Sequence, residues 1–176
     1  GFNAGSLLKF NFETTSILLN TLMSSVFGGF GAWIITLFYK EKVGVEIFSF
    51  GIISGLVGIT AGCYELTLIQ SAFVGFISAF IMHFSDQFLS KSLCIDVPLS
   101  VVSIHGVVGA WGTIAVGIFA ELPAGLSRFE FINVQIIGVL TAFIFAFSTG
   151  IILFYLLSKF NLLRVRKKHE VLGLNT

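Results

Sequence analysis

His105 is the strongest chemical signal in the sequence. It stands within SIHGVVGAWGT (residues 103–113), and no other residue between Val97 and Ala120 could carry a charge. An imidazole has two distinct nitrogens and an ordinary pKa of about 6.5, and burial disfavours its charged form. A neutral histidine could therefore offer one hydrogen-bond donor and one acceptor inside a narrow pore. The residues alone are equally consistent with a histidine that bonds a backbone carbonyl of a neighbouring helix.

The other reactive residue types do not form a catalytic or metal-binding set. His83 falls at a predicted membrane boundary and His169 near the end of the chain, and neither has a carboxylate at ligand spacing. Cys63 and Cys94 have neither CxxC nor metal-ligand spacing, which favours two reduced thiols packed as small apolar residues. The sequence also has no Ser-His-Asp or phosphate-loop pattern. We therefore expect no enzyme activity, no metal site and no cofactor.

The composition indicates an integral membrane protein that sits in a lipid bilayer. Of 176 residues, 56% are hydrophobic and only 11% are charged, and the mean hydropathy is +0.99. Soluble domains are typically about a quarter charged, so this chain has too little charge to cover a water-facing surface. The net charge of +1 and the absence of a basic patch interleaved with aromatics give no indication of nucleic-acid binding.

Long runs without Asp, Glu, Lys or Arg divide the chain. Each is near or above the roughly 18 to 20 apolar residues that cross a bilayer. Helices are expected, because they satisfy their own backbone in lipid, whereas barrel strands are about 9–11 residues long with strict alternation. Gly1–Leu8 resembles the end of a sixth, truncated helix of a longer protein. The five runs are Thr14–Tyr39, Ile47–Tyr64, Leu66–Ser85, Val97–Ala120 and Phe131–Ser158.

The joints between the runs predict an orientation in the membrane. If the runs cross alternately, eight basic residues fall on one side and two on the other, a positive-inside bias. This places the joints at Lys40 and Lys91, and the basic tail, in the cytoplasm. The joint at Glu65 demands a very tight turn, which Gly62 would help. The majority side holds Lys40, Lys42, Lys91, Lys159, Arg164, Arg166, Lys167 and Lys168, and the other side holds Lys9 and Arg128.

Small residues recur every fourth position and predict close helix packing. Such spacing lets helix backbones approach one another. Just before His105, Asp96 and Pro98 resemble a helix start, with Asp as the N-cap and Pro in the first turn. The packing sets are Ser54, Gly58 and Gly62, then Gly109, Thr113 and Gly117, with Gly106 and Ala110 as a further pair.

Several blocks, in this order, resemble the second half of the Amt/Mep/Rh ammonium transporter family, on its Amt side. The HGVVG and GFNAGS blocks are the most specific, and the resemblance spans nearly the whole chain. The blocks are GFNAGS at 1–6, NT at 20–21, SGLVGIT at 54–60, DVPLSVVSIHGVVGAWGT at 96–113, GIFA at 117–120, and LRV followed by LGL near the end.

The resemblance implies an all-α polytopic bundle with five full transmembrane helices plus the end of a sixth. This is half of an eleven-helix fold made of inverted repeats. Residues 1–163 would form the transmembrane domain, and residues 164–176 the start of a cytoplasmic tail. The family further implies a homotrimer in the cell membrane, one pore per subunit, and a PII-type regulatory protein as a partner at the cytoplasmic face.

The resemblance also assigns residues to a substrate pathway. His105 matches the second of two pore histidines, and Phe2 matches one of the phenylalanines that gate the outer mouth. Ser6 matches the hydroxyl that helps to recruit the ammonium ion, and Thr60 matches a polar position near the pore. The first pore histidine, the recruiting tryptophan, the other gate phenylalanine and the buried aspartate belong to the family's first half.

Two positions depart from the family pattern. Ser100 stands where the family commonly has Asp, which puts loop-to-tail communication in doubt. Ala61 follows Thr60 where Pro is usual, which would straighten a local kink. Neither change removes a pore residue, so the expected function is transport of ammonium or ammonia. The alternative is an ammonium sensor that couples the same fold to a signalling module. A third reading is a nonfunctional fragment or a separately encoded half that needs its partner.

Overall fold

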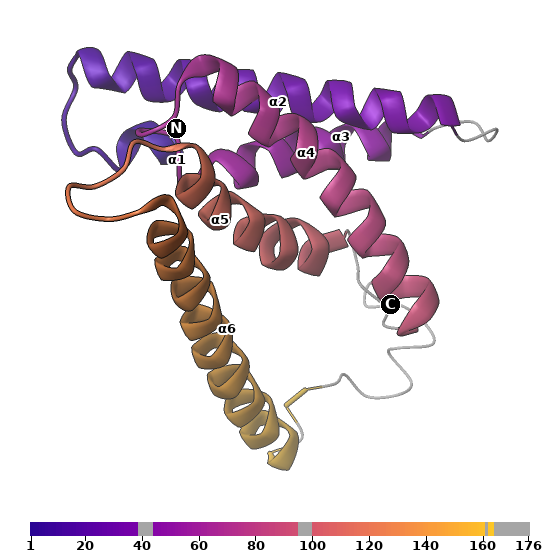
Figure 1. Cartoon of the computed structure of the whole chain (residues 1–176). Helices are drawn as coiled ribbons and strands as arrows, with labels where there is room; N and C mark the ends of the chain where they lie inside the picture. Colours follow the sequence, from indigo (N-terminus) through magenta and orange to yellow (C-terminus); the bar gives the residue numbers. More distant parts are fainter. Residues whose placement is uncertain (39–43, 95–99, 161, 164–176) are drawn as a thin grey trace. The chain divides into compact units, whose positions relative to one another are not determined.

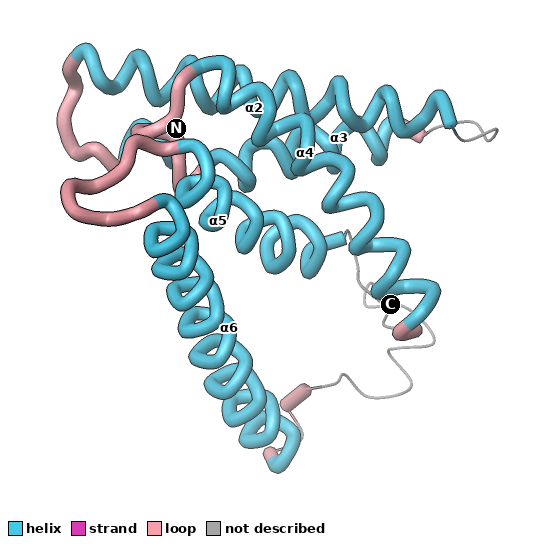
Figure 2. Tube along the Cα trace, in the orientation of Figure 1, coloured by secondary structure: helices cyan, strands magenta, loops and turns pink. Residues whose placement is uncertain are grey.

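The computed structural model describes residues 1–38, 44–94, 100–160 and 162–163 (Figure 1). It divides into two compact units, Gly1–Ile136 and Ile137–Thr176. Every regular element in the described ranges is a helix, as Figure 2 shows. The predicted tail at 164–176 and the predicted helix start at Asp96 and Pro98 lie outside the described residues.

The apolar runs form helices whose ends differ from the predicted runs by several residues. Within the described residues, four helical segments are long and apolar enough to cross a membrane: 12–38, 68–92, 102–119 and 128–159. The helices are α1 (Phe2–Gly5), α2 (Phe12–Phe38), α3 (Val45–Ile59), α4 (Leu68–Gln87), α5 (Gly109–Phe119) and α6 (Arg128–Lys159), with π-helical segments η1 (Phe88–Ser92) and η3 (Val102–Val108).

The second apolar run forms a shorter helix than the sequence predicts. α3 has 15 residues, which at about 1.5 Å per residue is shorter than the roughly 30 Å hydrocarbon core. The chain then turns over residues 60–66, so the predicted one-residue joint at Glu65 is wrong. Gly62 does shape this turn: its N–H donates to the Ile59 carbonyl (2.9 Å), and its carbonyl accepts from the Leu66 N–H (2.9 Å).

Glycines bring α2, α3 and α4 into backbone contact. The Ser24 hydroxyl on α2 donates to the Gly55 carbonyl on α3 at 2.7 Å. A Cβ atom on Gly55 or on Gly75 of α4 would collide with the Ser24 carbonyl. These helices therefore approach as closely as small-residue spacing allows. We call this packed region the glycine seam; its members are Ser24, Gly28, Gly51, Gly55, Gly58, Gly75 and Gly112.

The glycine seam also includes α5, through Gly112, which was not among the predicted packing glycines. A Cβ atom on Gly112 would collide with the Gly58 carbonyl, and one on Gly58 with the Ser78 hydroxyl. By contrast, a Cβ on Gly106 would come no nearer than 3.8 Å to another side chain, and one on Gly109 no nearer than 4.0 Å. The predicted close packing is thus right for Gly58 and wrong for Gly106 and Gly109, where an added Cβ atom would meet only side chains at ordinary van der Waals distance.

Asn20 stabilises the turn that follows α3 through two hydrogen bonds. It is buried on α2, and its amide nitrogen donates to the carbonyls of Cys63 (3.1 Å) and Leu66 (2.6 Å). Those carbonyls belong to a turn and have no helical partner, so a side-chain donor satisfies them. Burial also raises the pKa of the Cys63 thiol. Cys63 is packed as predicted, whereas Cys94 is exposed, so the packing prediction is wrong for Cys94.

Two side chains satisfy carbonyls at the end of α5. Gln70 donates to the Phe119 carbonyl at 3.0 Å. Arg128, in the first turn of α6, donates to the carbonyls of Gly117 (3.0 Å) and Ala120 (2.7 Å). The last carbonyls of a helix have no partner within it, so these bonds fix where α5 ends. α6 itself begins in the first unit and continues into the second.

The second unit contains the greater part of α6. No described residue of α6 is buried, and its surface is rich in apolar side chains. Phe143 and Phe147 stack with ring centroids 5.5 Å apart, and the Lys159 ammonium lies 5.7 Å from the centre of the Tyr155 ring. A basic and an aromatic side chain at a helix end are typical of a membrane–water boundary.

Candidate functional site

His105 lies in the π-helical segment η3, which the sequence analysis did not foresee. Ser103, Ile104 and Val108 of this segment are buried, whereas the His105 side chain is exposed. The imidazole is therefore accessible, although it belongs to a segment that is otherwise partly buried. π-Helical turns are rare and occur frequently at functional sites.

Two unfavourable features precede His105 in the chain. Ser100 adopts φ +54°, a left-handed conformation that is costly for a residue other than glycine. The Ser103 hydroxyl is fully buried and has no hydrogen-bond partner within the described part of the chain. An unpaired buried hydroxyl opposes folding, so the segment that carries His105 is locally strained.

A cavity of about 460 Å³ opens beside His105. Its wall comes from α1, from the end of α3 and the turn that follows it, and from the η3–α5 helix. The lining residues are Phe2, Val57, Thr60, Ala61, His105, Gly109 and Thr113.

The cavity brings together three of the four residues assigned to the substrate pathway. Phe2, Thr60 and His105 all line it, although they come from separate elements. Ser6 does not line it; the Ser6 hydroxyl is exposed and donates to the Phe2 carbonyl at 2.9 Å. Ala61, one of the two departures from the family pattern, is also part of the wall.

The cavity contains few polar groups. The Thr60 hydroxyl bonds the Leu56 carbonyl (2.9 Å), and the Thr113 hydroxyl bonds the Gly109 carbonyl (3.1 Å). The His105 ring makes no hydrogen bond with any residue that the structure describes. The remaining wall is aliphatic and aromatic carbon, which suits a small solute with few hydrogen bonds.

Thr113 and Gly109 were predicted to be packing positions from their spacing, but both are wall residues of the cavity. The signal was present, because positions 105, 109 and 113 recur every fourth residue and so share one helix face. The same spacing was interpreted as helix packing. Composition does not distinguish a helix face that meets a neighbour from one that borders a cavity.

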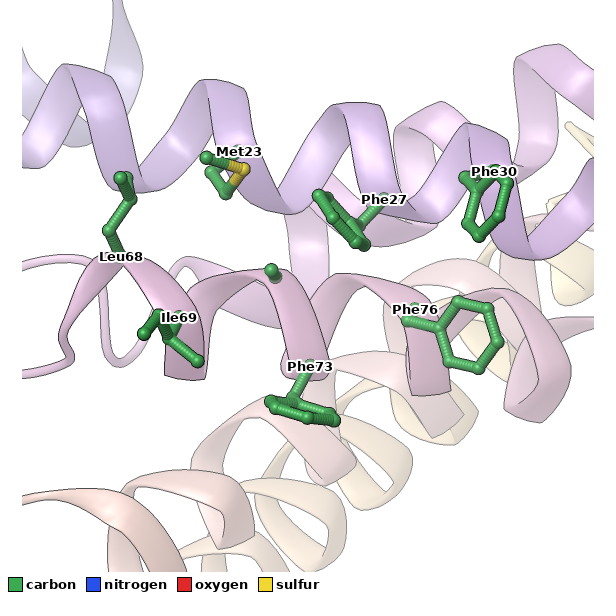
Figure 3. A pocket seen from close by; sticks show the side chains of 8 residues that line it. Met23, Phe27, Phe30, Leu68, Ile69, Phe73 and Phe76 are labelled. Atoms are coloured by element: carbon green, nitrogen blue, oxygen red, sulfur yellow. The ribbon is translucent and has the colours of Figure 1, made fainter.

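A second cavity, of about 410 Å³, lies between α2 and α4. In Figure 3, Met23, Phe27 and Phe30 of α2 face Leu68, Ile69, Phe73 and Phe76 of α4. Every lining side chain is apolar, so this groove has no nitrogen or oxygen side-chain atom that could accept or donate a conventional hydrogen bond. The described residues also contain no group of three His, Cys, Asp or Glu side chains able to hold a metal ion. The cavity at His105 is therefore the candidate functional site.

Comparison with known proteins identifies the family. The model of the Ammonium Transporter Family matches residues 1–176. The chain belongs to this family. Ammonium transporter Amt2 of Archaeoglobus fulgidus is 35% identical to it over 99% of the chain and 40% of its own length. A putative ammonium transporter of Synechocystis is also 35% identical, over the same shares of each sequence. The chain thus spans less than half the length of these curated relatives.

Solved structures of ammonium transporter family members have the same fold. A structure titled "Sensor Amt Protein" superposes with a TM-score of 0.92 at 34% identity, over 99% of this chain and 44% of that one. Mep2 of Saccharomyces cerevisiae has a TM-score of 0.81 over 90% of this chain and 40% of its own; at 24% identity this shows the fold alone. The predicted family and the predicted helical membrane fold are both confirmed.

Proposed function

We propose that this chain forms one half of a transmembrane pathway for ammonium or ammonia, with the cavity at His105 as part of that pathway. The observation that carries the proposal is that Phe2, Thr60 and His105 line a single cavity. Membership of the ammonium transporter family supports the substrate.

The chemistry of the wall suits this substrate. The apolar carbon around His105 has no groups that could replace the hydration shell of an ion. An ion that enters the cavity therefore loses its hydration water at a cost in free energy. The imidazole can accept a hydrogen bond from an N–H group, and the Phe2 ring can attract a cation before it is dehydrated. Ser6, outside the cavity, would act earlier, at the mouth. Potassium donates no hydrogen bond and gains less from such a wall.

The proposal extends to assembly and orientation. Residues 1–163 would be the transmembrane domain of one subunit of a homotrimer in the cell membrane. Residues 164–176 would begin a cytoplasmic tail, because eight of ten basic residues fall on that side. A PII-type regulatory protein would bind at the cytoplasmic face. Basic residues just inside a membrane also contact anionic lipid.

The decisive experiment measures the current that an ammonium pulse evokes in proteoliposomes containing the full-length protein. The wild type is compared with His105→Ala and with a matched control, His83→Ala, because His83 lies on α4 and does not line the cavity. We expect the current, or its selectivity for ammonium over potassium, to be lost only in His105→Ala. A His105→Ala protein that transports like the wild type contradicts the assigned role.

A second function, ammonium sensing, is favoured by one observation. The solved structure that superposes with a TM-score of 0.92 is titled "Sensor Amt Protein". A sensor would bind ammonium at the same cavity without a sustained flux. A protein that binds ammonium by calorimetry, yet passes neither current nor ammonia in proteoliposomes, would favour sensing over transport.

A further inference from the structure

We propose that Thr113 is a specificity-determining residue, which with Thr60 makes the cavity at His105 selective for small N–H donors. The inference rests on the proposed function, because it concerns the same cavity. Thr113 has no assigned role in the pathway, and the sequence analysis treated it as a packing residue.

The hydroxyls of Thr113 and Thr60 each form a hydrogen bond with a backbone carbonyl. The Thr113 hydroxyl bonds the Gly109 carbonyl at 3.1 Å, and the Thr60 hydroxyl bonds the Leu56 carbonyl at 2.9 Å. A carbonyl oxygen has no hydrogen, so the threonine must be the donor in both bonds. A hydroxyl has a single hydrogen and two lone pairs. Both oxygens are therefore left as acceptors only.

Thr113 and His105 belong to the same wall of the cavity. Residues 105, 109 and 113 share one helix face, and all three line the cavity. The residue between the other two is a glycine, and a Cβ atom there would have no neighbour closer than 4.0 Å. Position 109 itself therefore places no side chain between His105 and Thr113 on this face, and the nearest neighbour there is the Val57 side chain, which also lines the cavity.

Ammonium and water, as solutes in this cavity, differ in how well their hydrogen-bonding groups match its wall. Ammonium carries four N–H donors and no lone pair, so acceptor-only oxygens and the acceptor nitrogen of a neutral imidazole match it. Water has two donors and two lone pairs, and its lone pairs would find no donor at either threonine. Because unmet hydrogen-bonding capacity is costly in an apolar cavity, the two threonine oxygens favour ammonium over water as a hydrogen-bonding partner.

The test measures ammonium binding to the purified full-length protein by titration calorimetry, with potassium as a second probe. Thr113→Val keeps the β-branched shape and removes the oxygen, and Thr113→Ser keeps the hydroxyl. The matched control is Thr141→Val, because the Thr141 hydroxyl also bonds the carbonyl four residues earlier, at 2.8 Å, on the exposed surface of α6. Thermal unfolding of each variant separates a loss of binding from a loss of folding.

We expect Thr113→Val to weaken ammonium binding about tenfold or more, as for loss of a hydrogen bond to a charged group. Thr113→Ser should restore binding, and Thr141→Val should leave it unchanged. Unchanged ammonium affinity in Thr113→Val overturns the inference while the proposed function stands. A similar weakening of potassium binding overturns it also, because Thr113 would then be a general cation ligand. A wild type that neither binds nor transports ammonium contradicts the proposed function itself.

Discussion

The glycine seam and the face around His105 use the same residue type for opposite purposes. In the seam, Gly75 and Gly112 lie against backbone carbonyls of neighbouring helices. On the His105 face, a Cβ atom on Gly106 or Gly109 would meet only a side chain, at 3.8 or 4.0 Å. A missing side chain therefore closes the gap between helices in one region and keeps a cavity open in the other.

The difference shows that a small residue in a membrane helix does not by itself indicate that the helix packs closely at that position. Gly109 and Gly112 are three positions apart on α5, yet one lines the cavity and the other contacts Gly58. A rotation of the helix about its axis would exchange these roles. The contrast can be tested by adding side chains to each region in turn.

The largest effect is expected from a bulky residue inside the seam. Gly75→Val would drive its side chain into the Ser24 backbone, so α2 and α4 would have to separate. We expect a loss of about 3 kcal/mol in the free energy of unfolding, measured by thermal or denaturant unfolding of the purified protein. Gly138→Val on α6, where a Cβ meets nothing within 4 Å, is the matched control. Equal stability of the two variants would mean that the seam is not tightly packed.

A smaller loss is expected at the junction between the seam and the cavity. Asn20→Leu keeps the side-chain volume but leaves the carbonyls of Cys63 and Leu66 without their donor. We expect a loss of about 2 kcal/mol in unfolding free energy, together with weaker ammonium binding, because the same turn carries Thr60. Asn133→Leu, on a helix without buried residues, should change neither quantity. A fully stable Asn20→Leu protein would show that water satisfies the turn equally well.

Near the cavity, one truncation should stabilise the protein. Ser103→Ala removes a buried hydroxyl that has no partner among the described residues, and we expect the free energy of unfolding to rise by about 1 kcal/mol. The comparison variant is Ser78→Ala, because the Ser78 hydroxyl is equally buried but donates to the Val74 carbonyl at 2.7 Å. Ser78→Ala should lower stability. The idea fails if Ser103→Ala is the less stable of the pair.

The smallest effect is expected from the pair of α5 glycines. Gly109→Ala adds a methyl group that meets the Val57 side chain at an ordinary contact distance of 4.0 Å, so its stability should change by less than about 1 kcal/mol, and alanine's helix propensity favours an increase. Gly112→Ala adds the same group against the Gly58 carbonyl and should be the less stable variant. The two are compared by thermal unfolding under one condition. The reverse order would place the cavity on the other face of α5.

Much of the fold could be predicted because each apolar run is separated by charged joints. The run 131–158, for example, became α6 with ends within a few residues of the prediction. The end of α3 could not be predicted in this way, since residues 60–64 contain no charged residue that would mark the end of the run. Their turn depends on Asn20, which donates to it from another helix.

Some residues of the candidate site could likewise be predicted from the sequence, and others could not. His105 was identified from the sequence, because an isolated imidazole in an apolar run is costly and needs a purpose. Phe2, Ser6 and Thr60 came from a resemblance between motifs, and the structure brings only Phe2 and Thr60 to the cavity. Thr113 could not be recognised as a wall residue until the orientation of its helix was known.

The sequence by itself determined which segments are helical, that they lie in a membrane, and which family the chain belongs to, because hydropathy and ordered motifs are local properties. Only the tertiary structure decided which face of each helix packs. In a membrane helix the packed face and the lipid face are both apolar, so hydrophobic periodicity does not separate them. The rotation of α5 therefore had to be observed, and it is this rotation that puts Gly112 in the seam and Thr113 in the wall of the cavity.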